Sequence, residues 1–201
     1  GDHEGNPVII RAAVGDIGSA LHAVIGILFA IIARDKTGKG QFVDISMTDS
    51  VLPFLSVSLL RYFRDNFIPK RGWPSPTINI WQTKDGKYIT TGLVEPHFWE
   101  RFCRAIGRED LIPFHHAKGE KLHEVYGIIK DTILTKTRDE WFQIMKEADT
   151  CVSPVLELDE VINDPQLQHR AMFPEFEHPA LGKIRQLGMP VKLSDTPAKF
   201  R

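Results

Sequence analysis

An uncharged run at residues 17–33, bracketed by Asp16 and Arg34, constrains the fold more than any other feature. Its length reaches the lower limit of a membrane-spanning helix. Small and polar residues interrupt the run at Gly18, Ser19, His22 and Gly26. A helix that is apolar on all sides is also typical of the interior of a globular domain. We therefore predict a helix at about 17–34, buried on all sides, and not a membrane span.

The overall composition is that of an ordinary globular protein and excludes several functional classes. The chain has 201 residues, 42% hydrophobic and 25% charged, with a formal net charge of −1. It therefore lacks the overall basic field that non-specific binding to nucleic acid or an anionic membrane requires. The two cysteines, Cys103 and Cys151, form no CxxC motif, so we expect neither a metal site nor a disulfide framework. With no basic region at residues 1–4, no secretory signal is expected, and a reduced, cytoplasmic location fits best.

The first third of the chain reads as mostly helical. Residues 1–14 are expected to be extended or loop, because Gly5, Asn6 and Pro7 break any helix. After the helix at 17–34, local patterns predict a tight turn at 37–40, a half-buried strand at 41–47, and a helix from Thr48 or Asp49 to about Phe63. We assign residues 1–64 to one domain.

A polar, proline-marked stretch at 65–76 is predicted to link this domain to a second one at 77–193. Asp85-Gly86 lies between two strand-like runs and predicts a β-hairpin at 78–93. Further patterns predict helices at 96–106, 121–135, 138–148 and 158–163, an apolar run at 152–156, and a β-rich stretch to Leu193. The second domain should thus be a compact α+β unit with an antiparallel sheet, and residues 194–201 begin a further linker.

Asp16 is the first candidate for chemistry. The string Gly15-Asp16-Ile17-Gly18 places a carboxylate where a glycine-flanked loop enters the apolar helix. Small residues let a ligand approach the backbone, and the free N–H groups of a helix N-terminus attract negative charge. The plainer interpretation is that Asp16 is only the N-cap of that helix, and spacing alone favours it.

Glu95 is the second candidate, because it follows the second hairpin strand and precedes a helix that starts at Pro96. Capping or solvation would also explain it, and the neighbouring His97 reads as a surface group. The weaker candidates are the pair His115-His116 with Glu120 and His123, which reads as a solvated loop; four tryptophans at 73, 81, 99 and 141, which read as packing residues; and the turn at 37–40, which lacks P-loop spacing.

A long, ordered set of motifs resembles the CoA-transferase family III, also called the CaiB/BaiF family. It comprises Val14-Gly15-Asp16-Ile17-Gly18-Ser19-Ala20, Gly26-Ile27-Leu28-Phe29-Ala30, Arg34, Thr37-Gly38-Lys39-Gly40-Gln41, Val43-Asp44-Ile45-Ser46-Met47, Asp49, Lys84-Asp85-Gly86-Lys87-Tyr88, Cys151-Val152-Ser153-Pro154-Val155, Glu160-Val161, Asp164-Pro165, Gly188-Met189-Pro190-Val191-Lys192-Leu193-Ser194 and Thr196-Pro197. The resemblance therefore covers nearly the whole chain.

The resemblance implies an α/β protein in which Asp16 is the catalytic carboxylate. Coenzyme A, as a thioester, is the implied substrate, with Gly15, Gly18 and Lys39 as expected binding residues and no metal. Family members are about twice as long and form interlocked homodimers. The chain then corresponds to the end of a nucleotide-binding-like large domain plus the small α+β domain, and alone it is expected to be inactive.

Two chemistries of this family remain open, together with a third, non-catalytic reading. In a transferase, the aspartate attacks an acyl-CoA thioester and passes CoA to a carboxylic acid. In an α-methylacyl-CoA racemase, an aspartate and a histidine exchange the α-proton. Glu95-Pro96-His97-Phe98 resembles the racemase EPxF motif, whose glutamate supports that pair, whereas residues 182–197 resemble transferases. The third reading is a binding or assembly module. We expect the transferase.

Overall fold

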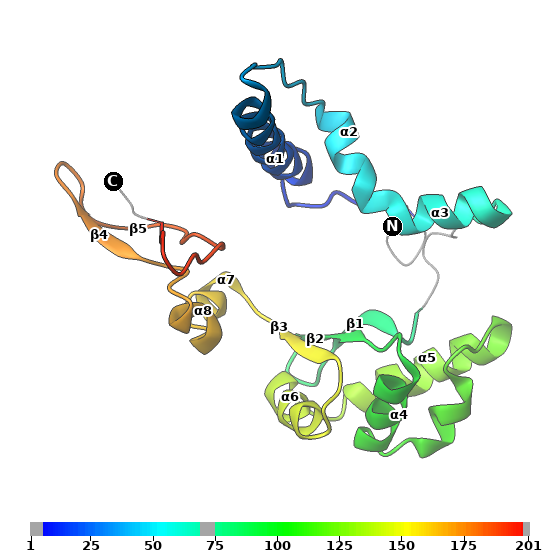
Figure 1. The fold of residues 1–201 in the computed structure, drawn as a ribbon. Coiled ribbons are helices and arrows are strands. Elements are labelled where there is room, and N and C mark those ends of the chain that lie inside the picture. The colour runs from blue at the N-terminus through cyan, green and yellow to red at the C-terminus, as the bar shows by residue number, and fades with distance from the viewer. Residues whose placement is uncertain (1–5, 69–74, 199–201) are drawn as a thin grey trace. The chain divides into compact units, whose positions relative to one another are not determined.

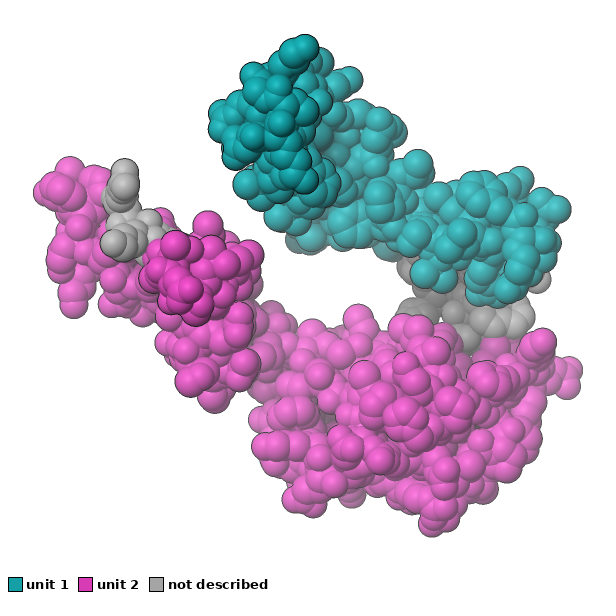
Figure 2. All heavy atoms as spheres, viewed as in Figure 1, with its two compact units in different colours: residues 1–74 teal, residues 75–201 magenta. Residues whose placement is uncertain are grey.

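The computed structural model describes residues 6–68 and 75–198 and has a mixed α/β fold with small antiparallel sheets (Figure 1). The chain divides into two compact units, residues 1–74 and 75–201, which Figure 2 distinguishes by colour. Each unit is described by itself below.

Unit 1 is built on helix α1, Val14–Thr37, which confirms the predicted long helix. Gly38 ends the helix in the left-handed conformation (φ 71°), and its N–H donates to the Arg34 carbonyl at 2.7 Å. The expectation that α1 is buried on all sides is wrong, since Gly18 is its only buried residue. Apolar side chains such as Leu21 and Phe29 are exposed because the described part of unit 1 packs against one side of α1.

By length and composition α1 also meets the requirements of a membrane span, with 24 residues and a window of mean hydropathy 2.0. Core helices of soluble proteins meet the same requirements. The contacts between α1 and residues 41–46 describe the environment of this helix more directly than its length and composition do. A Cβ at Gly26 would lie 2.9 Å from Val43 Cγ1 and 3.4 Å from Ile45 Cδ1, so this glycine lets the 41–46 segment approach the helix closely.

The segment at 41–46 corrects one prediction. It shows most of the expected alternation, since Val43 and Ile45 are half-buried while Phe42 and Asp44 are exposed, but it forms no strand in the described structure. Alternating polarity reports that one side of an extended segment is covered, and here a helix covers it instead of a neighbouring strand pairing with it.

The single helix predicted from Thr48 or Asp49 to Phe63 is also wrong in detail. It is three consecutive pieces: α2 at Met47–Val51, the 3₁₀ helix η1 at Leu52–Leu55, and α3 at Ser56–Asp65. Ser46 caps α2, because its Oγ accepts from the Asp49 N–H at 3.3 Å. Pro53, near the start of η1, lacks the N–H that a continuous α-helix needs, which accounts for the interruption.

Unit 2 contains the predicted hairpin. β1 (Ile78–Gln82) and β2 (Tyr88–Gly92) pair antiparallel, with Ile80 opposite Thr90, and Gly86 takes a positive φ of 77° in the connecting turn. The apolar run becomes β3 (Val152–Val155), which pairs antiparallel with β2 and completes a sheet of order β1-β2-β3. The antiparallel sheet expected in this region is therefore present.

Helices cover one face of this sheet (Figure 1). Three of the four predicted helices appear as α4 (Pro96–Ala105), α5 (Gly119–Ile133) and α6 (Arg138–Glu147), with an unpredicted 3₁₀ helix η2 (Glu109–Phe114) between α4 and α5. Trp81, Trp99 and Trp141 are buried in the core between sheet and helices, as predicted, whereas Trp73 lies outside the described residues.

After β3 the chain forms α7 (Leu158–Val161), α8 (Pro165–His169) and a second hairpin of β4 (Glu175–His178) and β5 (Gly182–Arg185). The β-rich prediction for this stretch holds for the hairpin but missed α8, which Asp164 caps through the Leu167 N–H at 2.9 Å. Gly188 then passes close to an earlier backbone segment, donating its N–H to the Met172 carbonyl at 2.8 Å.

Candidate active-site residues

Asp16 lies in the first turn of α1 with its side chain exposed, as predicted. The plainer N-cap interpretation is wrong, because Ala13 occupies the cap position and makes no side-chain bond to the helix. Among the described residues, none donates a hydrogen bond to the Asp16 carboxylate. The carboxylate is thus free to meet a ligand near the N-terminus of the helix. That it lies in a cleft stays a prediction.

Gly15 and Gly18 flank Asp16, and their surroundings indicate close packing of unit 1. A Cβ at Gly18 would lie 3.4 Å from the Phe54 ring, and one at Gly15 would lie 3.6 Å from Met47 Cε. The Gly15 carbonyl accepts from Ser19 Oγ at 2.6 Å. The small residues thus let α2 and η1 approach α1; their binding of coenzyme A stays a prediction.

Lys39 lies in the turn that follows α1. The Thr37 hydroxyl donates to the Ala33 carbonyl at 2.8 Å, and the Lys39 N–H donates to that hydroxyl at 3.3 Å. The turn is therefore fixed by local bonds, while the Lys39 side chain is exposed and free to meet an anion. Its predicted contact with coenzyme A is not tested by this geometry.

Glu95 occupies the N-cap position of α4, with Pro96 at the start of the helix, as the sequence predicted. Its side chain makes no capping bond and is exposed, so the capping explanation for this carboxylate does not hold. The Glu95 carbonyl accepts from the N–H groups of Phe98 and Trp99 at 3.1 and 3.2 Å. The backbone at Glu95 is therefore fixed while the carboxylate faces solvent. Asp16 and Glu95 belong to different units.

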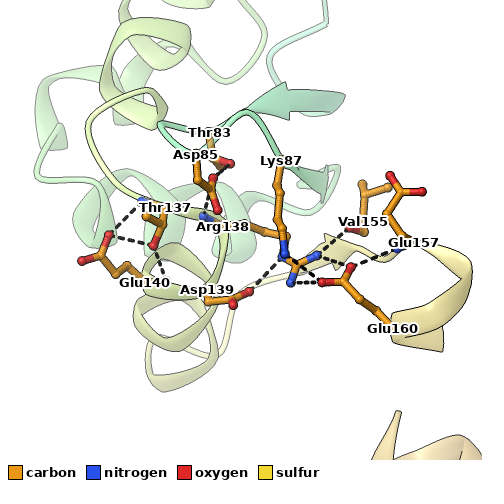
Figure 3. A network of polar contacts seen from close by, with 10 residues as sticks. All are labelled: Thr83, Asp85, Lys87, Thr137, Arg138, Asp139, Glu140, Val155, Glu157 and Glu160. Atoms are coloured by element: carbon orange, nitrogen blue, oxygen red, sulfur yellow. Dashed lines mark hydrogen bonds and ion pairs between the residues drawn. The ribbon is translucent and has the colours of Figure 1, made fainter. Parts of the chain in front are cut away.

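Two strongly perturbed ionisable groups, Arg138 and Glu160, lie elsewhere in unit 2, in a network that the sequence did not reveal (Figure 3). Arg138, at the start of α6, forms a two-pronged ion pair with Glu160 of α7, with N–O distances of 2.6 and 2.8 Å. Lys87 adds a third contact to Glu160 at 2.9 Å. The hydrogen bonds from Arg138 and Lys87 hold the pKa of Glu160 well below its usual range, and Glu160 in turn raises the pKa of Arg138.

The network of Figure 3 ties the ends of several elements together. Arg138 also donates to the Val155 carbonyl at 3.1 Å, and its backbone N–H donates to Asp85 at 3.2 Å. Thr83 anchors Asp85 through its hydroxyl at 2.6 Å, which lowers the pKa of that carboxyl. Arg138 and Lys87 pair with Glu160, and Asp85 accepts two hydrogen bonds, so the network is suited to stability and not to proton transfer. Only Lys84-Asp85-Gly86-Lys87 and Glu160 carried a hint of it, as parts of separate motifs.

Other reactive groups offer no competing centre. Burial raises the pKa of the Cys103 thiol to about 12, which keeps it protonated and unreactive. Within residues 6–68 and 75–198, no three His, Cys, Asp or Glu side chains gather as a metal site would require. The rings of His115 and His116 contact each other at a tilt of 31°, with centroids 4.2 Å apart.

Comparison with known proteins gives this geometry a context. The model of CoA-transferase family III matches residues 1–201. The chain is 29% identical over 229 aligned positions to a formyl-CoA:oxalate CoA-transferase of Bradyrhizobium sp. (strain ORS 278), covering 98% of this chain and 54% of that protein. The corresponding protein of Rhodopseudomonas palustris (strain BisA53) is 30% identical, covering 98% and 53%. The chain thus spans about half the length of these relatives.

Solved structures agree on the fold. The Rv3272 protein of Mycobacterium tuberculosis matches with a TM-score of 0.79 at 20% identity, covering 98% of this chain and 54% of that one. A CAIB/BAIF family protein from Brucella suis matches with a TM-score of 0.74 at 22% identity, covering 99% and 53%. At such identities the likeness extends to the fold alone.

Proposed function

This chain belongs to CoA-transferase family III, and from that premise we propose that it forms part of an enzyme that moves CoA from an acyl-CoA thioester to a carboxylic acid through Asp16. One observation carries the proposal: the Asp16 carboxylate is exposed in the first turn of α1, and the described residues leave it unbonded. The names of the transferase relatives support this chemistry over the alternatives.

The proposed reaction is a series of acyl transfers on Asp16. The Asp16 carboxylate attacks the thioester carbonyl, which forms a mixed anhydride and releases CoA thiolate. The thiolate then attacks the Asp16 acyl carbon, which gives an aspartyl-CoA thioester and frees the first acid. The acceptor carboxylate attacks this thioester, which forms a second mixed anhydride with Asp16 and releases CoA thiolate. The thiolate attacks the acceptor acyl carbon of that anhydride, which gives the new acyl-CoA and regenerates the Asp16 carboxylate. Splitting one transfer into several nucleophilic steps lowers each barrier.

In this proposal Lys39 and the backbone at Gly15 and Gly18 contact coenzyme A. Lys39 offers an exposed cation, which suits the phosphates of coenzyme A. The enzyme acts as an interlocked homodimer in the cytoplasm and uses no metal. The exposed apolar side chains of α1 support an assembly larger than this chain, because a large exposed apolar surface is typical of an interaction site.

A trapping experiment tests the role of Asp16. The full protein is incubated with formyl-CoA or succinyl-CoA and then treated with hydroxylamine or borohydride. Mass spectrometry then measures the mass of the peptide that contains Asp16. We expect a modified Asp16 peptide in the wild type. Asp16→Asn should abolish CoA exchange and the modification together. Turnover of substrate without any modified Asp16 peptide would show that the transferase proposal is wrong.

The exposed Glu95 at the head of α4 supports a second candidate, the racemase. There Asp16 would exchange a proton with the α-carbon of a 2-methylacyl-CoA and form no adduct, while Glu95 would support the acid–base pair. Incubation with a chiral 2-methylacyl-CoA in deuterated water separates the two candidates. Deuterium at the α-carbon, together with a loss of about 100-fold or more on Glu95→Gln, would identify the racemase. For the transferase, Glu95→Gln should have a mild effect.

A non-catalytic module is the remaining candidate. The exposed apolar surface of unit 1 is compatible with a piece that functions only when bound to a partner. The mass of the full protein in solution, measured together with CoA exchange, decides between this reading and an enzyme. Assembly without exchange or α-deuteration of any acyl-CoA would favour the module.

A further inference from the structure

Glu95 lies in the loop between β2 and α4, and the side chain of His115, from a distant part of unit 2, contacts this loop. His115 follows η2 and lies 22 residues beyond Leu93 in the sequence. Its Nε2 lies 2.8 Å from the Leu93 carbonyl oxygen, a hydrogen-bond distance at which a protonated Nε2 donates. Leu93 is fully buried, and its own N–H donates to the Thr77 carbonyl at 2.8 Å.

The His115 ring is itself held in place. It stacks on Trp99 with ring centroids 5.4 Å apart and planes 19° apart. Trp99 is buried in α4, and its Nε1 donates to the carbonyls of Leu111 and Ile112 at 3.3 and 3.1 Å. His115 thus joins the β2–α4 loop to η2 through a ring whose orientation is fixed by packing.

This bond restricts the position of Glu95. Because the peptide group is planar, a fixed Leu93 carbonyl fixes the plane of the Leu93–Val94 peptide. Only the dihedral angles of Val94 and those of Glu95 itself then separate that plane from the Glu95 side chain. On the other side, α4 holds the Glu95 carbonyl through the Phe98 and Trp99 N–H groups. The loop is short and anchored at both ends, while the carboxylate remains in solvent.

We propose that His115 is a positioning residue for Glu95: it fixes the β2–α4 loop and thereby sets where the carboxylate is presented to the substrate. This inference rests on the racemase candidate proposed above, in which Glu95 supports the acid–base pair. His115 does not touch substrate in this proposal and acts only through the Leu93 carbonyl.

Four variants of the full protein separate the hydrogen bond from the stacking. His115→Phe keeps a ring on Trp99 but loses the donor. His115→Gln places an amide nitrogen as many bonds from Cβ as Nε2, whereas His115→Asn places it one bond closer, where it cannot reach the Leu93 carbonyl. His116→Phe is the control, because His116 is exposed and its ring contacts His115.

Hydrogen exchange across residues 93–99, followed by mass spectrometry, reads the loop without any assay of activity. Faster exchange, by roughly 10-fold, is expected for His115→Phe and His115→Asn, since a released loop opens locally more often. His115→Gln should restore slow exchange, and His116→Phe should match the wild type. Equal exchange in His115→Phe and wild type would overturn the proposal.

Kinetics then test whether His115 acts through Glu95. In the α-deuteration assay, His115→Phe should lower kcat by the larger factor and KM by little. In the Glu95→Gln background the same change should have no further effect, because residues that act through one another are not additive. The same loss in both backgrounds would contradict the proposal. If Glu95→Gln alone leaves activity unchanged, the assignment of Glu95 fails, while the exchange experiment still judges His115.

Discussion

Units 1 and 2 use apolar residues in opposite ways. In unit 2 the large apolar side chains of the sheet and three helices meet in a core that includes Trp99, Ile129 and Trp141. In the described part of unit 1, by contrast, Gly18 and Ser50 are the buried residues, and the apolar side chains of α1 face outward. The apolar composition of a segment therefore indicates that something covers it, but it does not identify the partner that does so.

The difference suggests how stability is distributed. Unit 2 has a core of large buried apolar side chains, and burial of such surface is the dominant favourable contribution to folding. Unit 1 as described buries little and keeps its shape by the close approach of α1 to the 43–54 segment. The predictions below compare matched substitutions in buried and exposed settings.

The largest expected difference concerns apolar truncations. Ile129→Ala should lower the free energy of unfolding of unit 2 by about 3 kcal/mol, because Ile129 is fully buried. Leu21→Ala, at a side chain 58% exposed on α1, should change it by less than about 0.5 kcal/mol. Urea unfolding followed by tryptophan fluorescence measures the first, and circular dichroism follows the helices of both units.

The same pair of variants can also break the comparison. If Leu21→Ala destabilises the protein as much as Ile129→Ala does, α1 is covered in solution. Repeating the measurement over a range of protein concentrations then identifies the cover, since a second copy would make the effect depend on concentration.

Local patterns predicted the elements of unit 2 well, for reasons that particular residues show. Asp85-Gly86 supplied the turn geometry of the hairpin, and Thr137 with Glu140 forms a capping box that begins α6 where expected. In unit 1 the alternation at 41–47 was read as a strand, because periodicity reports burial of one side and does not name the partner. The position of Asp16 in the first turn was predictable, whereas its lack of a capping role was not.

Contacts between distant residues were beyond sequence reasoning. Arg138 and Glu160 are 22 residues apart, as are Leu93 and His115, and no local spacing indicates that either pair meets. The sequence also could not show that the Glu95 side chain leaves its helix uncapped, since Glu95 occupies a position where capping is common. Such features depend on how the helices and strands pack together, whereas the sequence predicted only which helices and strands form.

The second prediction concerns charge and compares a buried with an exposed arginine. The Arg138 side chain is 6% exposed, and Arg138→Met should destabilise unit 2 by about 2 to 3 kcal/mol, because it removes both Arg138 bonds to Glu160 and the donor to the Val155 carbonyl. Arg104→Met removes exposed pairs with Glu100 and Glu109 and should shift the urea midpoint only slightly. Equal effects of the two variants would show that the network of Figure 3 adds no more than a surface pair.

The same network predicts a dependence on pH. The pKa of Glu160 is lower in the folded protein than its ordinary value of 4.5, so its contribution to stability is complete above that value and is lost as the pH falls below it. In Glu160→Gln this part of the acid dependence should be absent. Urea midpoints of wild type and variant at pH 7, 5, 4 and 3, chosen to bracket that ordinary value, measure the difference, which should shrink towards the acid end.

The smallest expected difference compares one substitution at two glycines. A Cβ at Gly188 would lie 2.3 Å from the Ala171 carbonyl oxygen and 2.9 Å from Met172 Cα, both of which are backbone atoms that cannot turn aside. Gly188→Ala should therefore separate these segments and destabilise the end of unit 2 by about 1 to 2 kcal/mol.

At Gly26 in α1 the nearest atoms are side-chain carbons of Val43 and Ile45, which can shift. There the clash is offset by the helix preference of alanine, worth up to about 1 kcal/mol, so Gly26→Ala should be near neutral. Hydrogen exchange at residues 170–190 and 14–37 measures each effect where it arises. A strong loss of protection in α1 on Gly26→Ala, with none around Gly188→Ala, would reverse the comparison and place the tighter packing in unit 1.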